Sequence, residues 1–350
     1  MKKILFTGGG SAGHVVPNLA LMEELAYEGK TELCYMGTNG VEKELVSKWK
    51  LPFYEIECPK LIRGGGFSAL KNNVKIPFAF LRAVRQAEEG LRTFSPDLVF
   101  SKGGYVALPV VFACKRLGIP CFAHESDFTP GLANKLSAKK CETVFTSFPE
   151  TAERLKNGKF SGAPMRRSLF APTKAEGRRY FDVKKTDKVV LVFGGGSGSQ
   201  KINDAVRNSL KTLLKEHVVL HVTGKGKRVH ATYKGYRQFE FIADMGMAYA
   251  CADVVVSRAG AGTVFETLAL KKRALFIPLE GATRGDQIQN AEYFKCKGLC
   301  HVLREAELSL LPKAIDEVEQ DTLLGENLAN SSFTSGNERI LSALKERLYP

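Results

Sequence analysis

An apolar run followed at once by a glycine-rich turn occurs twice in this chain, about half its length apart. The first copy is Ile4-Leu5-Phe6 with the turn Gly8-Gly9-Gly10-Ser11, and the second is the run 189–193 with Gly194-Gly195-Gly196-Ser197-Gly198. A buried strand that enters a glycine turn and then a helix is the opening unit of a Rossmann-like domain. The repeat therefore predicts two such domains rather than one enlarged sheet.

Short β-prone runs alternate with longer helical patterns along the sequence. We expect strands at 4–7, 33–36, 98–101, 121–124 and 143–146, and again at 189–193, 218–222, 239–242, 254–257, 275–278 and 300–303. This alternation predicts an α/β fold with doubly wound parallel sheets. We expect domains at 1–162 and 163–336, and a C-terminal helix at 337–350 for which packing back on the N-terminal domain is one option. Because ligands bind at the carboxyl ends of such strands, the glycine turns should point into a cleft between two facing domains.

Composition narrows the class of protein without deciding it. No apolar run is long enough to predict a transmembrane helix, and the start of the chain lacks a signal-peptide pattern, so we expect a cytoplasmic protein. The eight cysteines form no C-x-x-C pair, which favours reduced, buried thiols. A net charge of +14 suits a nucleic acid, an anionic lipid or a phosphorylated substrate.

The first glycine turn fits the dinucleotide fingerprint only in part. Gly8, Gly10 and Gly13 have the G-x-G-x-x-G spacing, but the second strand ends at Gly37-Thr38 without the acidic residue that would bind a ribose. The residues after Gly13 also lack the lysine of a P-loop. Both NAD and ATP are therefore disfavoured as ligands.

A histidine, His14, stands where a dinucleotide phosphate would otherwise lie. A helix N-terminus lowers the pKa of an imidazole and favours the neutral form, which can accept a proton. We therefore expect His14 to be a general base. The alternative is a histidine that only forms hydrogen bonds within its turn.

A second small-residue loop, Gly260-Ala261-Gly262, follows the expected strand 254–257. If a helix begins near Thr263, the loop lets a diphosphate reach the helix N-terminus, and Glu266 can accept from ribose hydroxyls. The alternative is a plain capping box between Thr263 and Glu266. Farther along, Gln287 is suited to a sugar hydroxyl, and its neighbour Asp286 to an N-cap role.

The set His124-Glu125-Ser126-Asp127 also ends a strand, with anchoring of loops as the competing interpretation. No Asp-x-Asp occurs, so the sequence does not signal a metal held by carboxylates. Helix N-termini and basic side chains such as Arg166 would then balance the charge of a diphosphate.

A basic stretch from Lys60 to Arg92 is interleaved with apolar residues. This composition is typical of a membrane-surface patch, for which we expect Lys71, Lys75, Ile76, Phe78, Phe80, Leu81, Arg82 and Arg85. The alternative is an amphipathic helix with Phe78, Leu81 and Val84 facing the core. The stretch lacks a recognised nucleic-acid-binding motif, so we expect no nucleic-acid partner.

Several motifs, taken together and in order, resemble the MurG family of peptidoglycan glycosyltransferases. They are the turn from Gly8 to Asn18, Lys102-Gly103-Gly104-Tyr105, His124-Glu125, Gly131-Leu132-Ala133-Asn134-Lys135, Gly162-x-Pro164-x-Arg166, Gly194-Gly195-x-x-Gly198, Ser257-Arg258-Ala259-Gly260-Ala261-x-Thr263-x-x-Glu266 and Asp286-Gln287-x-x-Asn290-Ala291. The resemblance covers nearly the whole chain. It implies the GT-B fold, with two Rossmann-like domains facing a cleft.

By this resemblance, the donor UDP-N-acetylglucosamine binds mostly in the second domain. The resemblance implies donor contacts for Ser11, Ala12, Gly13, Asp127, Arg166, Gly196, Ser197, Ile242, Ala261, Gly262, Thr263, Val264, Phe265, Glu266 and Gln287. Ile242 would lie against uracil, residues 261–266 would hold the diphosphate and ribose, and Gln287 would bind the transferred sugar. The chain departs from the family at Asp127, where asparagine is usual, and at Gly196, where serine is usual.

The resemblance further implies an inverting transfer of N-acetylglucosamine to the C4 hydroxyl of undecaprenyl-diphospho-N-acetylmuramoyl-pentapeptide, lipid I, with His14 as base. We expect no cofactor and no metal, and a peripheral location on the anionic cytoplasmic face of the cell membrane. A sugar-nucleotide epimerase, a dinucleotide-dependent oxidoreductase and a basic nucleic-acid-binding protein remain the alternatives.

Overall fold

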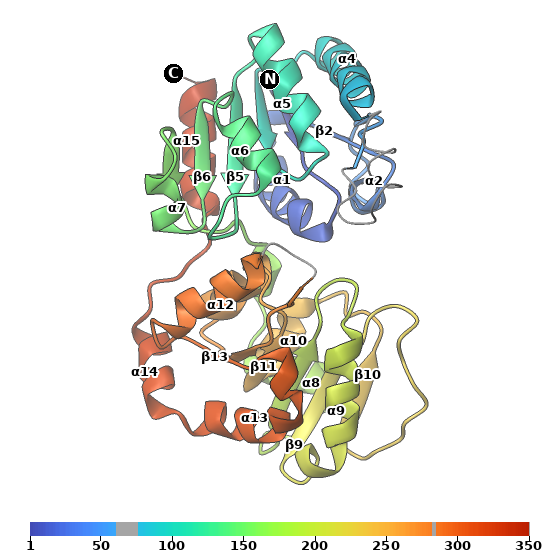
Figure 1. The fold of residues 1–350 in the computed structure, drawn as a ribbon, viewed down its shortest axis with the longest axis vertical. Helices are drawn as coiled ribbons and strands as arrows, with labels where there is room; N and C mark the ends of the chain where they lie inside the picture. Colours follow the sequence, from blue (N-terminus) through green and yellow to red (C-terminus); the bar gives the residue numbers. More distant parts are fainter. Residues whose placement is uncertain (61–75, 282–284, 350) are drawn as a thin grey trace. The chain divides into compact units, whose positions relative to one another are not determined.

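The chain forms two compact units in a computed structural model that describes residues 1–60, 76–281 and 285–349 (Figure 1). Unit 1 comprises Met1–Arg166 together with the C-terminal Ser335–Pro350, and unit 2 comprises Arg167–Thr334. The chain therefore leaves unit 1 once and returns to it at its end.

Unit 1 is built on a parallel sheet whose strand order is β3-β2-β1-β4-β5-β6-β7. The strands are β1 (Lys2–Thr7), β2 (Thr31–Gly37), β3 (Phe53–Glu55), β4 (Leu98–Ser101), β5 (Cys121–Glu125), β6 (Thr143–Thr146) and β7 (Gly158–Phe160). The chain starts in the middle of this sheet, winds outward to β3, and then crosses back to β4. The neighbours β1 and β4 thus form the point at which the winding direction changes.

Helices cover both faces of the first sheet: α1 (Val16–Glu28), α2 (Val41–Ser47), α4 (Ile76–Phe94), α5 (Ala107–Leu117), α6 (Leu132–Ala138), α7 (Pro149–Glu153) and α15 (Asn337–Leu348). Successive residues of β1 alternate between two cores, because side chains alternate across a strand. Ile4 and Phe6 pack with residues of α1 and α15, while Leu5 packs with residues of α4 and α5. The C-terminal helix is therefore part of the core of unit 1.

Unit 2 repeats this plan with a parallel sheet of order β10-β9-β8-β11-β12-β13. The strands are β8 (Lys188–Phe193), β9 (His217–Val222), β10 (Tyr236–Phe239), β11 (Val254–Ser257), β12 (Arg273–Phe276) and β13 (His301–Val302). The helices are α8 (Lys174–Tyr180), α9 (Gln200–Leu213), α10 (Met245–Cys251), α11 (Ala261–Ala269), α12 (Asp286–Lys295), α13 (Leu311–Gln320) and α14 (Thr322–Asn330). Here β8 and β11 form the change of winding direction.

The predicted α/β fold with two doubly wound units is confirmed, but parts of the strand assignment are wrong. The expected strand 239–242 lies at Tyr236–Phe239, and the expected strand 275–278 lies at Arg273–Phe276. In the second case the apolar run continues past the strand as Ile277-Pro278, while in the first the pairing covers the more polar segment before Phe239. The short edge strands Phe53–Glu55 and Gly158–Phe160 were not expected, because their partly exposed residues form no apolar run.

Candidate functional site

Each unit places two small-residue turns side by side at the carboxyl ends of its central strands. In unit 1 these turns follow β1 and β4, and in unit 2 they follow β8 and β11. Ligands of open α/β sheets bind at this position, outside the carboxyl ends of the strands where the winding direction changes. The topology thus marks one candidate region in each unit.

In unit 1, His14 ends a short 3-10 turn, Ala12–His14, which comes directly before α1. Its Nδ1 lies 2.9 Å from the Oγ of Ser11, and its side chain is partly buried. Burial, and after it the positive charge of Lys102, lowers the pKa of His14 from 6.5 to about 4. The imidazole is therefore neutral at neutral pH, as expected, and burial and Lys102 add causes that the sequence pattern did not indicate.

The second glycine turn, after β4, packs directly against the first. Gly104 has φ +79°, and a Cβ there would lie 2.3 Å from the carbonyl oxygen of Gly9 and 3.3 Å from Nδ1 of His14. Any larger residue would strain the backbone and push the first turn away. The glycine at this position thus allows the turn after β4 to support the histidine.

A buried carboxylate, Glu42 on α2, lies beneath the first glycine turn, and our sequence analysis missed it. Its oxygens accept from the backbone N–H groups of Gly10 (3.2 Å) and Thr38 (2.9 Å). An acid therefore does reach the end of β2, where we expected none, but it comes from the next helix. Because backbone N–H groups donate to this carboxylate, Glu42 orders the turn. The sequence signal that could have revealed it is an acidic residue four positions after Thr38.

Lys102, the first residue after β4, is only 1% exposed and donates through Nζ to Ser126 Oγ at 2.6 Å. The Glu125 carboxylate accepts from the N–H groups of Asp127 (3.0 Å) and Gly131 (2.9 Å) and from Asn134 Nδ2 (2.8 Å). Glu125 thus anchors the loop that carries Asp127. The buried His124 contacts the Gly162 carbonyl through Nε2 at 3.0 Å.

In unit 2, helix α11 begins at Ala261, with Gly260 as its N-cap. The capping box between Thr263 and Glu266 is therefore wrong, since Thr263 already lies inside the first turn. The small residues 260–262 leave open space around this helix N-terminus, where a Cβ at Gly260 or Gly262 would meet no atom within 4 Å. The first backbone N–H groups of a helix have no partner within it and suit an anion.

The other predicted donor residues divide into ones that face solvent and ones that pack inside. Val264 and Phe265 are buried core residues of α11, and Ile242 is also buried. Glu266 is partly exposed and accepts from the Tyr249 hydroxyl at 3.3 Å. Gly196 and Ser197 lie in an exposed turn after β8.

Two polar donor candidates lie outside these turns. Gln287 lies at the start of α12, and its side-chain oxygen accepts from the backbone of Leu279 at 3.0 Å. Gly285 is the N-cap of this helix, so the N-cap role of Asp286 is wrong. Arg166 ends unit 1, and its buried Nε has no hydrogen-bond partner within the described residues.

Arg258, the first residue after β11, is buried and committed to the protein itself. Its guanidinium donates to Ser199 Oγ (2.8 Å) and forms an ion pair with Glu305 (2.6 Å). It also donates to the carbonyl oxygens of Ile277 and Pro278. This arginine therefore holds the turns of unit 2 together instead of meeting a phosphate.

The expected membrane patch falls partly on α4, while Lys71 and Lys75 lie outside the described residues. Phe78 is 77% exposed and Leu81 is 47% exposed, whereas Val84 is buried. The alternative in which Phe78 and Leu81 face the core is thus wrong. Phe80 is partly buried against Phe112, and Ile76 is also partly buried. Arg82 and Arg85 are exposed, and Arg82 forms an ion pair with Glu57.

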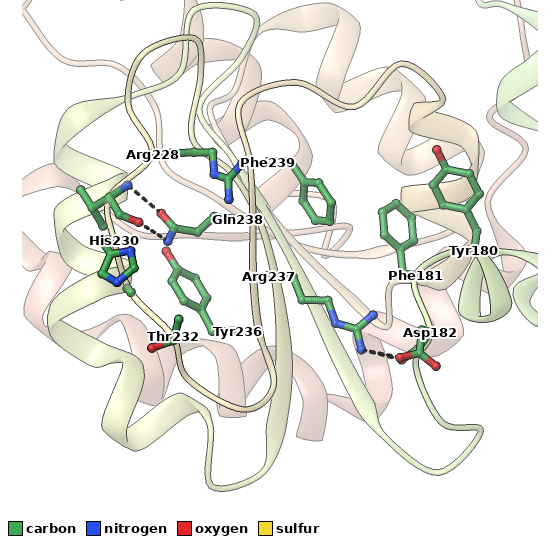
Figure 2. A pocket seen from close by; sticks show the side chains of 12 residues that line it. Tyr180, Phe181, Asp182, Arg228, His230, Thr232, Tyr236, Arg237, Gln238 and Phe239 are labelled. Carbon is green, nitrogen blue, oxygen red and sulfur yellow. Dashed lines mark hydrogen bonds and ion pairs between the residues drawn. The ribbon is translucent and has the colours of Figure 1, made fainter.

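A hollow of about 640 Å³ runs along the edge strand β10 (Figure 2). The side-chain amide of Gln238 bonds both backbone groups of Val229 on one side, and Arg237 reaches Asp182 on the other. None of the predicted site residues lines this hollow.

In the part of the chain that is described, no helix is long and apolar enough to span a membrane, and no cluster of His, Cys, Asp and Glu side chains is suited to a metal ion.

Comparison with known proteins identifies the family. The glycosyltransferase family 28 N-terminal domain matches residues 4–146, and the corresponding C-terminal domain matches residues 189–343. A Clostridium perfringens protein named UDP-N-acetylglucosamine–N-acetylmuramyl-(pentapeptide) pyrophosphoryl-undecaprenol N-acetylglucosamine transferase is 44% identical over 91% of this chain and 90% of its own. The chain belongs to the MurG family.

Further relatives agree with this family assignment. A Lachnoclostridium phytofermentans protein of the same name is 42% identical and covers 99% of both chains. The crystal structure of Acinetobacter baumannii MurG matches 99% of this chain and 100% of its own, with a TM-score of 0.76 and 25% identity. These matches confirm the predicted family and the GT-B fold.

Proposed function

We propose that this protein transfers N-acetylglucosamine from UDP-N-acetylglucosamine to the C4 hydroxyl of undecaprenyl-diphospho-N-acetylmuramoyl-pentapeptide, with inversion. The family and the names of its relatives support the substrates. The observation that carries the chemistry is the neutral His14 at the point where β1 and β4 meet.

The nucleotide part of the donor binds to unit 2. The N-terminus of α11 receives the diphosphate through its free N–H groups, and Glu266 accepts from the ribose hydroxyls. Ile242 lies against uracil, and Gln287 donates from its amide nitrogen to the transferred sugar, since its oxygen already holds Leu279. Val264 and Phe265 contribute through packing, because their side chains lie in the core.

The acceptor hydroxyl reacts at unit 1. With a proton on Nδ1, His14 donates to Ser11 Oγ and keeps the lone pair of Nε2 for the acceptor. The C4 oxygen bonds to the anomeric carbon, its proton passes to Nε2, and the bond to the UDP oxygen breaks with its electron pair on UDP. The α-linked donor thereby becomes a β-linked disaccharide, and helix N–H groups stabilise the leaving diphosphate.

The acceptor carries a polyprenyl chain, so the enzyme works at a membrane surface. We assign docking to the exposed face of α4, where Phe78 and Leu81 enter the interface and Arg82 and Arg85 meet anionic headgroups. This assigns the protein to the cytoplasmic face of the cell membrane as a peripheral protein. Lys71 and Lys75 remain predicted members of the same patch.

The test mixes the purified protein with UDP-N-acetylglucosamine and a short-chain lipid-linked muramoyl pentapeptide. We expect UDP release that depends on the acceptor, and a β-linked disaccharide product. Donor conversion without an acceptor would instead indicate an epimerase, and absence of donor binding would contradict the proposal. The soluble acceptor separates the chemistry from membrane docking.

A further inference from the structure

A buried lysine at the meeting point of three loops is unexplained by the roles assigned so far. The backbone N–H of Lys102 donates to the Thr7 carbonyl at 2.8 Å, which ties it to the end of β1. Its stem passes so close to the first glycine turn that a Cβ at Gly8 would lie 3.0 Å from its own Cβ. Its ammonium then reaches Ser126 after β5. Through its backbone and its side chain, this one residue at the end of β4 thus contacts the ends of β1 and β5.

Burying an ammonium group is unfavourable unless acceptors and negative charges surround it. Burial lowers the pKa of Lys102, while the carboxylates of Glu125 and Asp127 oppose this and favour the charged form. Ser126 Oγ is the hydrogen-bond acceptor. A methionine of similar length would fill this space without a buried charge, so the charge itself requires an explanation.

The ionisable side chains in these loops indicate which of them is affected by the charge of Lys102. Burial lowers the pKa of both His14 and His124, and the positive charge of Lys102 lowers both further. Glu42, on α2, directs its carboxylate to Gly10 and Thr38. Tyr105, next to Gly104, has a raised pKa because of burial and Glu42. Among the charged groups, Lys102 is therefore the one whose field acts on His14.

We propose that Lys102 is a positioning residue whose buried charge acts on His14 across the first glycine turn and fixes the loop bearing Asp127. The inference rests on the proposed function, in which His14 must begin the reaction without a proton on Nε2. A like charge beside an imidazole disfavours the imidazolium form, so His14 remains able to accept at any pH above its own titration. Through Ser126, the same ammonium holds the loop beside Glu125.

The experiment compares Lys102→Met, which removes the charge, with Ser126→Ala, which removes only the hydrogen-bond partner. Histidine-selective isotope labelling follows the titration of the six imidazoles by NMR, and His14→Gln identifies the signal of His14. In Lys102→Met we expect the His14 midpoint to rise by about one pH unit, a tenfold change in proton affinity. In Ser126→Ala we expect it to stay within a few tenths of a unit.

An unmoved His14 midpoint in a folded Lys102→Met variant would overturn the proposal. If that variant does not fold, the proposal is tested on the wild-type protein, because the 13Cε chemical shift of Lys102 reports whether its side chain is charged. A charged side chain at pH 7 is expected, and a neutral one would equally overturn the proposal. Both readouts are taken without substrates, so they stand even if His14→Ala disproves the base. In turnover, the acid limb of kcat should move to higher pH in Lys102→Met.

Discussion

The two units share a strand order around their central strands, yet they place opposite kinds of chemistry at the same point. In unit 1, buried ionisable groups support the turns after β1 and β4: Glu42 accepts from the backbone N–H of Gly10, and the charge of Lys102 acts on His14. In unit 2, the turn after β11 offers small residues and a helix N-terminus, and its arginine is neutralised by Glu305. In the proposed function, one unit controls a proton and the other receives an anion.

This difference shows that the fold fixes where a ligand binds but not what happens to it. A fixed helix dipole with free N–H groups needs no titratable side chain to hold a diphosphate. A general base needs the reverse, namely a titratable group whose protonation state is set by its neighbours. His14→Ala should remove one side of this contrast, and Glu266→Ala should remove the other.

The largest effect is expected for His14→Ala. Loss of a general base lowers the rate by about 10²–10⁴-fold, so kcat should fall by this factor while UDP-N-acetylglucosamine binding changes little. Disaccharide formation and donor binding by calorimetry measure the two quantities. The matched control is His230→Ala, an exposed histidine of unit 2, which should retain full turnover. Near-normal turnover of His14→Ala would contradict the assignment.

Glu266→Ala should break the other side of the comparison. A hydrogen bond to a charged group contributes about 1.5–3 kcal/mol, which predicts donor binding weaker by about tenfold to a hundredfold. The KM for the lipid-linked acceptor should remain unchanged. Tyr249→Phe is the control, because it removes the 3.3 Å contact to Glu266 but keeps the carboxylate. Equal losses in both variants would indicate that Glu266 acts only through its packing.

The membrane patch of unit 1 should respond to changes that leave the chemistry alone. Phe78 is 77% exposed, so Phe78→Ser removes little stability but should weaken binding to anionic vesicles by about tenfold. Arg85→Ala should weaken it by about fivefold, since a surface charge contributes about 1 kcal/mol there. Tyr180→Ser, a 60% exposed aromatic of unit 2, is the control. Vesicle binding that ignores these changes and salt would exclude α4 as the docking face.

The sequence predicted the parts of this structure that depend on local pattern. The glycine turns and buried strands gave both doubly wound units, because these signals lie within a few residues of one another. Glu42 and Lys102 could not be found in this way, since their roles depend on burial by distant elements. The beginning of α11 was misplaced because Thr263 and Glu266 imitate a capping box, whereas Gly260 caps the helix without a side chain. Burial and Lys102, which lower the pKa of His14, likewise depend on elements distant in the sequence.

The smallest effect concerns a buried histidine of unit 2 that has no role in the reaction. His221 contacts the Tyr236 hydroxyl (2.9 Å) and Asn203 Oδ1 (3.0 Å), and burial lowers its pKa from 6.5 to about 3. Below pH 6.5 the unfolded chain binds a proton that the fold excludes, so unit 2 loses stability as the pH falls toward 3.

His221→Asn should reduce this pH dependence by up to about 1.4 kcal/mol per pH unit. Hydrogen exchange of the β8 and β9 amides, followed from pH 7 to pH 4, measures it for unit 2. Fluorescence of Trp49, the single tryptophan of the chain, follows unit 1 in the same samples and should show the same pH dependence in both proteins. If the pH dependence of stability changed in both units together, the two would unfold as one cooperative body. The difference between the units would then lie in their chemistry alone. If only unit 2 changes, the units are also separate in stability, and each site can be altered without destabilising the other.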